Sequence, residues 1–470
     1  MSTKKENPVI DYDSFRDSFA TVDQEGKRKW IYPKMPKGRL HNKRVIVSII
    51  LLALMFIGPF LRWKGAPMFL FNILERKFII FGVPFWPQDF HLLALAIITF
   101  FVFIILFTAI FGRVWCGWAC PQTIFMEMVF RKIEYWIEGD APKQKKLTRQ
   151  PWNREKILKR GGKWLIFAIL AFLIGNLVMA YIIGTDELSK LVTEGPAEHW
   201  GKFSFVLIFS GIFFFVFAYF REQACLVICP YGRLQSALLD RDSVVVHYDD
   251  VRGEPRGRGR DRSELGDCID CHQCVTVCPT GIDIRNGTQM ECVNCTACID
   301  ACDEIMDKVN KPRGLVRFAS TNMVEEQKGF KITPRIIAYA VVLTLLSGVL
   351  ITSLAMRSTI EATVLRARGT LYSLSEDKQV VTNIYQLQIA NKTHQSFGDI
   401  EVRLLEPEGG KATLVGKELH VDDQGLGKGS VLVEIPRSIL SEMKTPIKLG
   451  FYSGETELDI VKTKFMGPGN

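Results

Sequence analysis

The chain has 470 residues and a formal net charge of +9, and 48% of its residues are hydrophobic. This length exceeds that of one ordinary domain, and the hydrophobic fraction, with a mean hydropathy of +0.12, argues against a soluble enzyme and indicates a membrane protein. The positive charge gathers beside apolar stretches, so we expect it to contact anionic membrane lipid and no nucleic acid.

Five apolar stretches approach the length that spans a bilayer, roughly 17–25 residues. Buried helices of a soluble protein are the alternative, but five stretches this apolar argue against them. Between the first two stretches, Met68–Trp86 is also apolar, yet the charged run Glu75–Lys77 interrupts it, so we expect an interfacial or extracytoplasmic loop. The predicted spans are Val45–Leu61, Leu92–Phe111, Trp164–Ile183, Phe203–Phe220 and Ile336–Ala355.

The distribution of charge around these spans predicts their orientation. Basic residues crowd the segment before the first span and the loop between the second and third, whereas the next loop is acidic. The positive-inside rule therefore places the N-terminal segment, residues 1–44, in the cytoplasm, and five spans then place the C-terminus outside. No apolar core of a signal peptide is evident at the start of the chain. We expect a multi-pass protein of a bacterial cytoplasmic (inner) membrane.

Two short cysteine motifs follow the second and fourth predicted spans, at the cytoplasmic boundary of the membrane. They are Cys116-x3-Cys120-Pro121 and Cys225-x3-Cys229-Pro230. If each span helix continues, the two sulfurs of a pair share one helix face. If it breaks, the proline suits the first position of a new helix, and Cys120 and Cys229 lie at its N-terminus, where the helix dipole favours thiolate.

The repetition of this motif at one membrane face favours a functional role for the four thiols over inert buried cysteines. Four soft thiolates suit Cu(I) or a further iron–sulfur centre. A dithiol–disulfide redox relay is a third alternative. The spacing alone does not choose among the three.

Eight cysteines between the fourth and fifth spans form two runs of the bacterial ferredoxin type, in which three ligands of each 4Fe–4S cluster come from one run and the fourth from the other. Two zinc sites are the alternative, but zinc does not require a third and a fourth cysteine at these spacings. Asp303 stands where a proline usually follows the last ligand. The assignment is cluster one to Cys268, Cys271, Cys274 and Cys302, and cluster two to Cys292, Cys295, Cys298 and Cys278.

All 12 cysteines of the chain belong to these motifs, which leaves none for a structural disulfide and indicates a reducing compartment. Within the first run, we expect His272 to tune the cluster by hydrogen bonding and not to ligate it. Ahead of that run lies a basic, glycine-rich segment, Arg252–Arg260. It is either a solvated linker or an electrostatic contact with an anionic donor or with the clusters.

After the fifth span the pattern changes to short alternating runs separated by turn residues such as Glu408-Gly409-Gly410. This pattern is typical of a β-sandwich of immunoglobulin size. The fold class is therefore a multi-domain membrane protein with five transmembrane helices, a two-cluster ferredoxin-like cytoplasmic domain and a C-terminal immunoglobulin-like sandwich. The predicted division is 1–44 cytoplasmic segment, 45–230 four spans with both CxxxCP motifs, 231–335 cluster domain, 336–355 fifth span and 356–470 extracytoplasmic (periplasmic) sandwich.

The combination of motifs resembles, over nearly the whole chain, the cytochrome c oxidase accessory proteins of the CcoG/FixG/RdxA family. The resemblance rests on GRVWCGWACPQTIF at 112–125, ACLVICPYGRLQ at 224–235, RGEPRG at 252–257, the two ferredoxin runs and NIYQLQIANKT at 383–393. It implies two 4Fe–4S clusters on the eight assigned cysteines, with Cys116, Cys120, Cys225 and Cys229 as the copper or redox site. It also implies a cupric reductase that supplies Cu(I) for assembly of cbb3-type oxidase, with oxidase subunits or assembly factors as partners.

We expect a cytoplasmic electron donor, but the sequence does not indicate its identity. Two other functions compete with copper reduction. A membrane electron conduit would exchange electrons with quinone and need no copper. A scaffold would recruit oxidase subunits through the sandwich, with structural or sensory clusters.

Overall fold

The computed structural model describes residues 21, 27–259, 263–327, 329–367, 369, 371–375, 377, 379–416, 419–440 and 442–468. The side chains of residues 233 and 236 are not described. The chain divides into two compact units. The first comprises residues 1–60 and 95–348, and the second comprises residues 61–94 and 349–470.

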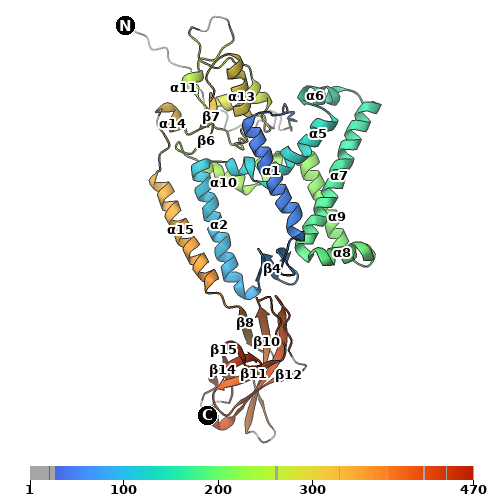
Figure 1. The fold of residues 1–470 in the computed structure, drawn as a ribbon, viewed down its shortest axis with the longest axis vertical. Helices are drawn as coiled ribbons and strands as arrows, with labels where there is room; N and C mark the ends of the chain where they lie inside the picture. Colours follow the sequence, from blue (N-terminus) through green and yellow to red (C-terminus); the bar gives the residue numbers. More distant parts are fainter. Residues whose placement is uncertain are drawn as a thin grey trace. The chain divides into compact units, whose positions relative to one another are not determined.

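Five helices among the described residues are long and apolar enough to cross a membrane, which confirms the predicted spans (Figure 1). Each begins before the predicted stretch, because preceding residues join the same helix, whereas α1 and α9 end before the predicted stretch does. The helices are α1 (Arg39–Ile57), α2 (Phe90–Phe111), α7 (Arg154–Ile183), α9 (Trp200–Phe215) and α15 (Pro334–Ala355). Short 3₁₀ turns adjoin two of them, η1 (Gly58–Phe60) after α1 and η2 (Pro87–Asp89) before α2.

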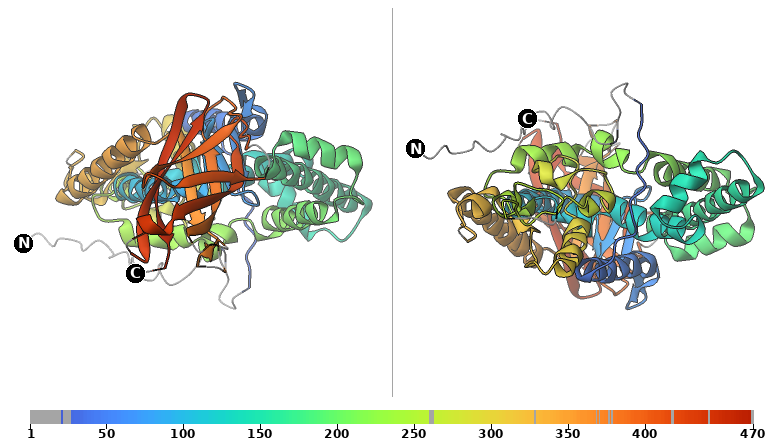
Figure 2. Two further views of the ribbon diagram at one scale, coloured as in Figure 1. Left: turned by 90° about the horizontal axis from the view of Figure 1, so that it is seen from below. Right: turned by 90° about the horizontal axis from the view of Figure 1, so that it is seen from above.

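The helices of the first unit pack through aromatic side chains. Helices α7 and α9 lie side by side, joined by α8 (Thr185–Glu194), as the green ribbons of Figure 2 show. Phe130 stacks on Phe217 with ring centroids 4.8 Å apart and meets Phe167 edge-on at 4.6 Å. Such pairs add to the burial of apolar area between the spans.

Helical segments between the spans carry the cysteine motifs, and three of them are π-helical: η3 (Phe125–Phe130), η4 (Val216–Phe220) and η5 (Ala224–Ile228). π-Helical turns are rare in proteins, and those that occur often lie at functional sites. The α-helices of these segments are α3 (Val114–Trp118), α4 (Pro121–Ile124), α5 (Arg131–Ile137), α6 (Ala141–Arg149) and α10 (Pro230–Leu238).

The region of the two ferredoxin runs is built on one antiparallel pair of strands, β6 (Val245–Tyr248) and β7 (Val316–Ala319). Its helices are α11 (Asp250–Gly253), α12 (Gln273–Thr276), η6 (Ile284–Asn286), α13 (Ala297–Lys308) and α14 (Thr321–Glu325). Asp300 of α13 accepts hydrogen bonds from the backbone N–H groups of Leu40 and His41, at 3.1 and 2.7 Å. It therefore caps α1 and ties this region to the first span.

The second unit contains a small sheet before the second span and a sandwich after the fifth. Met68–Trp86, which we predicted as a loop, forms the three-stranded sheet β3 (Phe69–Asn72), β4 (Lys77–Ile80) and β5 (Val83–Phe85), and just before it β1 (Arg62–Trp63) pairs with β2 (Ala66–Pro67). Asp89 at the end of this segment forms buried ion pairs with Arg357 at 2.5 Å and Lys392 at 2.8 Å. These contacts hold the small sheet against the sandwich within the unit.

The sandwich confirms the predicted immunoglobulin-like β fold. One sheet has the order β12-β13-β10-β8 with β9 beside β10, and the other has the order β11-β14-β15. Alternate residues such as Tyr385, Leu387 and Ile389 are buried between the sheets, as expected for the two-residue period of a strand. The strands are β8 (Ile360–Arg366), β9 (Ser373–Leu374), β10 (Val380–Asn391), β11 (Ile400–Glu406), β12 (Lys411–Val415), β13 (Leu426–Pro436), β14 (Lys444–Ser453) and β15 (Thr456–Met466), with the 3₁₀ turn η7 (Arg437–Ile439) after β13.

Candidate functional site

The two ferredoxin runs have the same local backbone. In the first run Asp270 and His272 have positive φ angles of 52° and 56°, and in the second Asn294 and Thr296 have 51° and 66°. These residues follow the first cysteine of their run by the same numbers of positions. Left-handed conformations are uncommon for residues other than glycine. Their repetition shows that both loops turn around an enclosed space in the same way.

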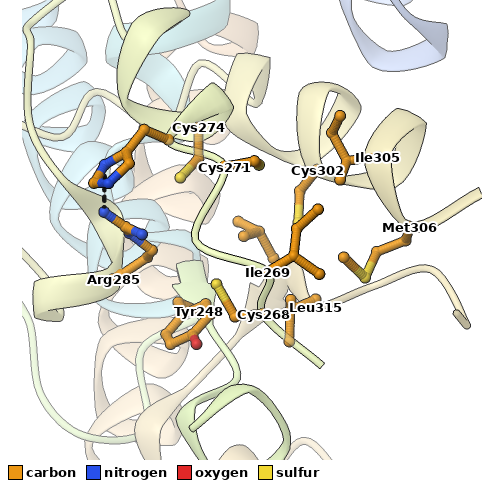
Figure 3. Close-up of a pocket in the computed structure, with 12 residues that line it drawn as sticks. Tyr248, Cys268, Ile269, Cys271, Cys274, Arg285, Cys302, Ile305, Met306 and Leu315 are labelled. Atoms are coloured by element: carbon orange, nitrogen blue, oxygen red, sulfur yellow. Dashed lines mark hydrogen bonds between the residues drawn. The ribbon is translucent and has the colours of Figure 1, made fainter. Parts of the chain in front are cut away.

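The first loop surrounds a cavity of about 360 Å³ (Figure 3). Its lining includes Cys268, Cys271 and Cys274 of the first run together with Cys302, which comes from the second run through α13. Ile305, Met306 and Leu315 complete an apolar wall. The structure therefore brings together the four cysteines assigned to cluster one.

A second cavity of about 350 Å³ has the complementary cysteines in its lining, Cys292, Cys295 and Cys298 from the second run and Cys278 from the first. Cys274 lines both cavities, so the two are neighbours. The exchange of the fourth cysteine between runs, expected from their spacing, is thus present in the fold.

The donor set of each cavity fits a 4Fe–4S cluster, which needs four thiolates in a largely apolar shell. Burial raises the pKa of Cys278, and backbone N–H groups of Thr280, Gly281 and Ile282 point at its sulfur and oppose that rise. N–H groups of Asn294 and Ala297 do the same for Cys292 and Cys295. Such donors stabilise a sulfur that carries negative charge as a ligand.

Two polar side chains adjoin the cavity of cluster one. The Tyr248 hydroxyl donates to Glu254 Oε1 at 3.1 Å and also contacts Cys268, so its one proton is shared between the two groups. Arg285 is buried between Asp283 and Asp270, at 2.6 Å from each. His272 contacts Arg285 through Nδ1 at 2.8 Å, which Figure 3 shows as a dashed line, and approaches Asp270 through Nε2 at 3.2 Å. His272 also lines this cavity itself, together with Arg285.

The CxxxCP motifs adopt the second of the two predicted local structures, in which the helix breaks. Cys120 and Cys229 are the N-cap residues of α4 and α10, with Pro121 and Pro230 at the first helical positions. Their partners belong to the preceding segments, Cys116 to α3 and Cys225 to η5. The proline ring is tolerated at this position because no backbone donor is needed there.

The four thiols of the two motifs are neighbours. Burial and the adjacent thiols Cys120 and Cys229 raise the pKa of Cys116 to about 11, against which Gln235 and Arg113 act. Burial and the other three thiols raise the pKa of Cys225 to about 12. Within the described ranges, no group of three or more His, Cys, Asp or Glu side chains is arranged to hold one metal ion.

The first CxxxCP motif lies directly against the loop of cluster two. A Cβ atom on Gly117 would collide with the carbonyl oxygen of Val293 and lie 3.0 Å from the carbonyl of Asn294. Cys116 packs against the apolar group that contains Val293 and Cys295. Glycine is needed here because it lets two backbones approach closely.

Two arginines strengthen this junction. Arg113 donates to the carbonyl oxygens of Met290 and Gly232, the latter at 2.5 Å, and interacts electrostatically with both Cys116 and Cys292. Arg44 of α1 donates to the carbonyl oxygen of Gly117 at 2.6 Å and lies near Cys295. Both cations stand between the four-thiol group and cluster two, where they favour negative charge on sulfur.

Gln235 of α10 is a further neighbour of the four-thiol group that the sequence analysis did not assign. Its Nε2 lies 3.3 Å from Cys116 Sγ, and the side chain is fully buried. Tyr231 hydrogen-bonds to Gln235 and to Thr108 Oγ1, the latter at 2.7 Å. The position of Gln235, five residues after Pro230, was visible in the sequence, but its contact with the first motif was not.

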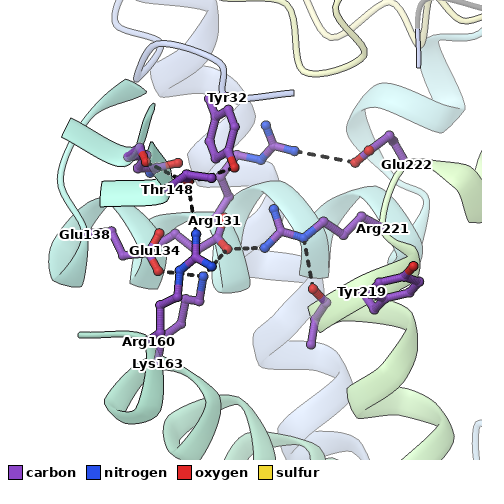
Figure 4. Close-up of polar contacts among 12 residues, drawn as sticks. Tyr32, Arg131, Glu134, Glu138, Thr148, Arg160, Lys163, Tyr219, Arg221 and Glu222 are labelled. Atoms are coloured by element: carbon purple, nitrogen blue, oxygen red, sulfur yellow. Dashed lines mark hydrogen bonds and ion pairs between the residues drawn. The ribbon is translucent and has the colours of Figure 1, made fainter. Parts of the chain in front are cut away.

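A buried network of charges, whose residues Figure 4 draws as sticks, reaches Cys225 through its electrostatic neighbour Glu222. Glu134 of α5 pairs with Arg221 and with Lys163 of α7, and Lys163 also pairs with Glu138 at 2.7 Å. Glu222 pairs with Arg28 at 2.9 Å and lies 4.0 Å from Arg131. Arg131 also pairs with Glu127 at 3.1 Å, so four carboxylates face four cations, and the network connects α5, α7 and the segment that leads to Cys225 without a net buried charge.

Comparisons with known proteins agree with these features. A profile of a 4Fe-4S dicluster domain matches residues 220–321, and that of a 4Fe-4S binding domain matches residues 93–143. A third profile, the Ig-like fold at the C-terminus of FixG, matches residues 350–468.

Three curated proteins are similar to most of the chain. RdxB of Cereibacter sphaeroides is 35% identical over 78% of this chain and 80% of its own length. RdxA of the same organism is 36% identical over 77% of this chain and 79% of its own length. The nitrogen fixation protein FixG of Rhizobium meliloti is 34% identical over 63% of this chain and 58% of its own length.

Proposed function

The chain belongs to the FixG/RdxA family of membrane iron–sulfur electron-transfer proteins, and on that premise we propose that it reduces Cu(II) to Cu(I) at its four-thiol group. In this proposal the Cu(I) is used to assemble a cbb3-type cytochrome c oxidase. Copper is the substrate, and Cys116, Cys120, Cys225 and Cys229 receive it.

Eight cysteines hold the resident cofactors in this proposal. Cluster one binds to Cys268, Cys271, Cys274 and Cys302, and cluster two binds to Cys292, Cys295, Cys298 and Cys278. Each cluster, when bound, accepts and returns one electron. The N–H groups around Cys278, Cys292 and Cys295 and the hydroxyl of Tyr248 stabilise the added negative charge.

The observation that carries the proposal is the junction at Gly117. It joins the loop of cluster two and the four-thiol group by direct backbone contact, with Arg113 facing sulfurs of both. The cavity of cluster one adjoins that of cluster two, since Cys274 lines both, and none of the four thiols lines it. The four-thiol group is therefore placed to exchange electrons with cluster two, and cluster one is placed to receive them from a donor.

Thiol chemistry supports copper as the substrate. Soft sulfur ligands prefer Cu(I) over Cu(II), so binding at the four-thiol group makes the reduction more favourable. One electron converts Cu(II) to Cu(I), and no oxygen atom or hydride is transferred. The raised pKa values of Cys116 and Cys225 mean that copper displaces protons when it binds these thiols.

Orientation and partners complete the proposal. The basic flanks of the spans favour a cytoplasmic N-terminus, cytoplasmic clusters and a periplasmic sandwich in a bacterial inner membrane. The four-thiol group then faces the cytoplasm at the membrane boundary. The sandwich, which has no cysteine, is the surface offered to oxidase subunits or assembly factors.

The test uses purified protein with both clusters assembled under anaerobic conditions. After the clusters are reduced with dithionite and excess reductant is removed, Cu(II) is added with a Cu(I)-specific chelator. We expect reoxidation of the clusters with one Cu(I) formed per electron lost. Replacing Cys116, Cys120, Cys225 and Cys229 by Ser should abolish Cu(I) formation while the cluster absorbance remains. Clusters that are not reoxidised by Cu(II) but are reoxidised by a quinone would favour the membrane electron conduit instead.

A second candidate for the four-thiol group is a further iron–sulfur centre. The match of a 4Fe-4S binding domain to residues 93–143, which contain only the first CxxxCP pair, favours it. Iron and sulfide analysis separates the two readings. Equal iron content in wild type and the four-Ser variant supports copper as substrate, whereas a loss of one cluster's iron in the variant supports the additional centre.

A further inference from the structure

An open recess of about 950 Å³ lies beside the cavity of cluster one. Its lining is Arg258, Gly259, Ile269, Cys271, Val309 and Lys311. Ile269 and Cys271 also line the cluster-one cavity. A molecule seated in the recess would therefore touch a cysteine assigned to that cluster. The cavity of cluster two shares no lining residue with this recess.

The recess combines an apolar floor with a cationic rim. Ile269 and Val309 are apolar, and the two charged lining residues, Arg258 and Lys311, are both cations. Each has a carboxylate partner that is less exposed than itself. The Arg258 side chain is 68% exposed against 31% for Asp270, and that of Lys311 is 42% exposed against 17% for Asp267. The outward face of the rim is thus positive.

The basic glycine-rich segment builds this rim. Arg252 makes its contacts within the cluster region: it pairs with Asp267 at 2.5 Å and donates to the carbonyl oxygens of Pro312 and Arg313. Arg258 instead donates to the carbonyl oxygen of Asp270 from Nε and Nη2, at 2.9 and 2.6 Å. Because Asp270 directly precedes Cys271, this contact fixes the rim beside the cluster-one loop. The described part of the segment is thus more than a solvated linker.

We propose that this recess is the docking site for a small, acidic, one-electron carrier protein that supplies the clusters. An apolar centre with a charged rim suits a transient electron-transfer complex, which buries little area and depends on electrostatic steering. An acidic surface would meet Arg258 and Lys311 and bring the redox group of the carrier toward Cys271. One electron leaves the carrier for the cluster, no bond forms or breaks, and no proton moves.

This inference rests on the assignment of cluster one and names the donor class that the proposed function requires. It does not depend on what the four-thiol group binds. The experiment measures reduction of the clusters by the carrier. Its result can therefore be interpreted even if the protein does not reduce copper.

The experiment compares wild type with the double variant Arg258→Glu/Lys311→Glu, both with clusters assembled. Reduced acidic ferredoxin is mixed rapidly with each protein at low ionic strength, and cluster bleaching is followed. We expect the second-order rate constant of the variant to fall by about tenfold or more, and added salt to slow wild type much more than the variant. Binding of the oxidised ferredoxin, measured separately by its dissociation constant, should weaken in parallel.

Two controls keep the test specific. The variant Lys411→Glu/Lys428→Glu changes the charge equally on exposed positions of the sandwich and should react at the wild-type rate. Reduced methyl viologen, a small cation, should bleach the clusters of the recess variant no more slowly than those of wild type. Wild-type rates and affinities for the acidic carrier in the recess variant would overturn the proposal, as would equal rates for an acidic and a basic ferredoxin of similar potential.

Discussion

At the scale of single residues, the site depends on groups that touch the cysteines without belonging to their motifs. Gly117, Arg113 and Gln235 surround Cys116, and Tyr248 bonds to Cys268. Gly117 affects the cysteines by allowing close packing, and the other three residues affect them through polar contacts. Each of the four is buried or half-buried. Changes at these positions should alter redox behaviour before they alter the fold.

Replacing Gly117 by Ala should separate the four-thiol group from cluster two. The new methyl group meets backbone atoms of Val293 and Asn294, which cannot rotate away as a side chain can. We expect a loss of about 1–3 kcal/mol in stability, as for overpacking in a core, and slower Cu(I) formation with normal cluster absorbance. The matched control is Gly162→Ala in α7, where the methyl group meets nothing within 4 Å. Equal rates of Cu(I) formation in both variants would contradict the role given to Gly117.

Replacing Tyr248 by Phe should lower the reduction potential of cluster one. The hydroxyl shares its proton between Glu254 and Cys268, and the part that Cys268 receives favours the reduced cluster because that state carries more negative charge on sulfur. If the bond is stronger in the reduced state by ~1 kcal/mol, its loss shifts the potential by ~40 mV. Redox titration followed by electron paramagnetic resonance measures both clusters. A shift in neither cluster, or the same shift in Tyr181→Phe, would contradict this.

At the scale of elements, helix breaks and irregular turns place the thiols. Pro121 and Pro230 begin new helices after Cys120 and Cys229. The π-helical segment η5 contains Cys225, and the π-helical segment η3 follows α4. Arg221, between η4 and η5, has a φ of 52° and pairs with Glu134 of α5. This ion pair therefore holds an unfavourable backbone conformation four residues before Cys225.

Replacing Glu134 by Gln should loosen this arrangement. Burial would raise the pKa of Glu134, but the cations Arg221 and Lys163 lower it below its ordinary value. A carboxyl group whose pKa falls on folding adds stability above its unfolded-state pKa, and that stability is lost as pH falls through the folded-state value. The variant should lose about 3–5 kcal/mol near neutral pH because it leaves buried cations unpaired.

Thermal unfolding in detergent at several pH values checks this expectation. The difference in midpoint between wild type and Glu134→Gln should shrink toward strongly acidic pH, where wild type also loses the carboxylate. The exposed pair of Glu187 and Lys190 supplies a control, since Glu187→Gln should change the midpoint little. A gap between wild type and Glu134→Gln that does not depend on pH would argue against the ion-pair explanation.

At the scale of the whole molecule, stability has separate sources in the two units. The ferredoxin runs enclose two cavities lined by eight cysteines, so their fold relies on bound clusters. The sandwich has its own core, in which Tyr385, Val431 and Phe451 are fully buried, and it contains no cysteine. Loss of iron should therefore destabilise the unit that contains the ferredoxin runs and leave the stability of the sandwich unchanged.

Removal of the clusters by a chelator and an oxidant tests this division. Hydrogen exchange should increase strongly in residues 245–319, where the strands β6 and β7 and both runs lie. Exchange in β10 and β13 should remain unchanged, because their eleven paired residues are independent of iron. Comparable loss of protection in both regions would show that the sandwich depends on the clusters.

Much of the architecture follows from local patterns. Apolar length predicted all five spans, and alternation predicted the sandwich, because burial against lipid or in a core repeats along the chain with the period of the element. The small sheet at residues 69–85 was expected only as a loop. Its strands are three to four residues long, too short for a periodic signal.

The sequence by itself determined that this protein carries 4Fe–4S-binding runs, because ligand type and spacing along the chain define how many sulfurs a loop can offer. It also left open whether the CxxxCP helices continue or break, which the structure decided in favour of a break. Only the tertiary structure decided which groups adjoin the sulfurs. Gly117 meets Val293, Gln235 meets Cys116, and Arg258 borders Cys271 across sequence separations that no local pattern encodes. Such contacts arise when separately folded elements pack, and in the proposed function they set where electrons enter and leave.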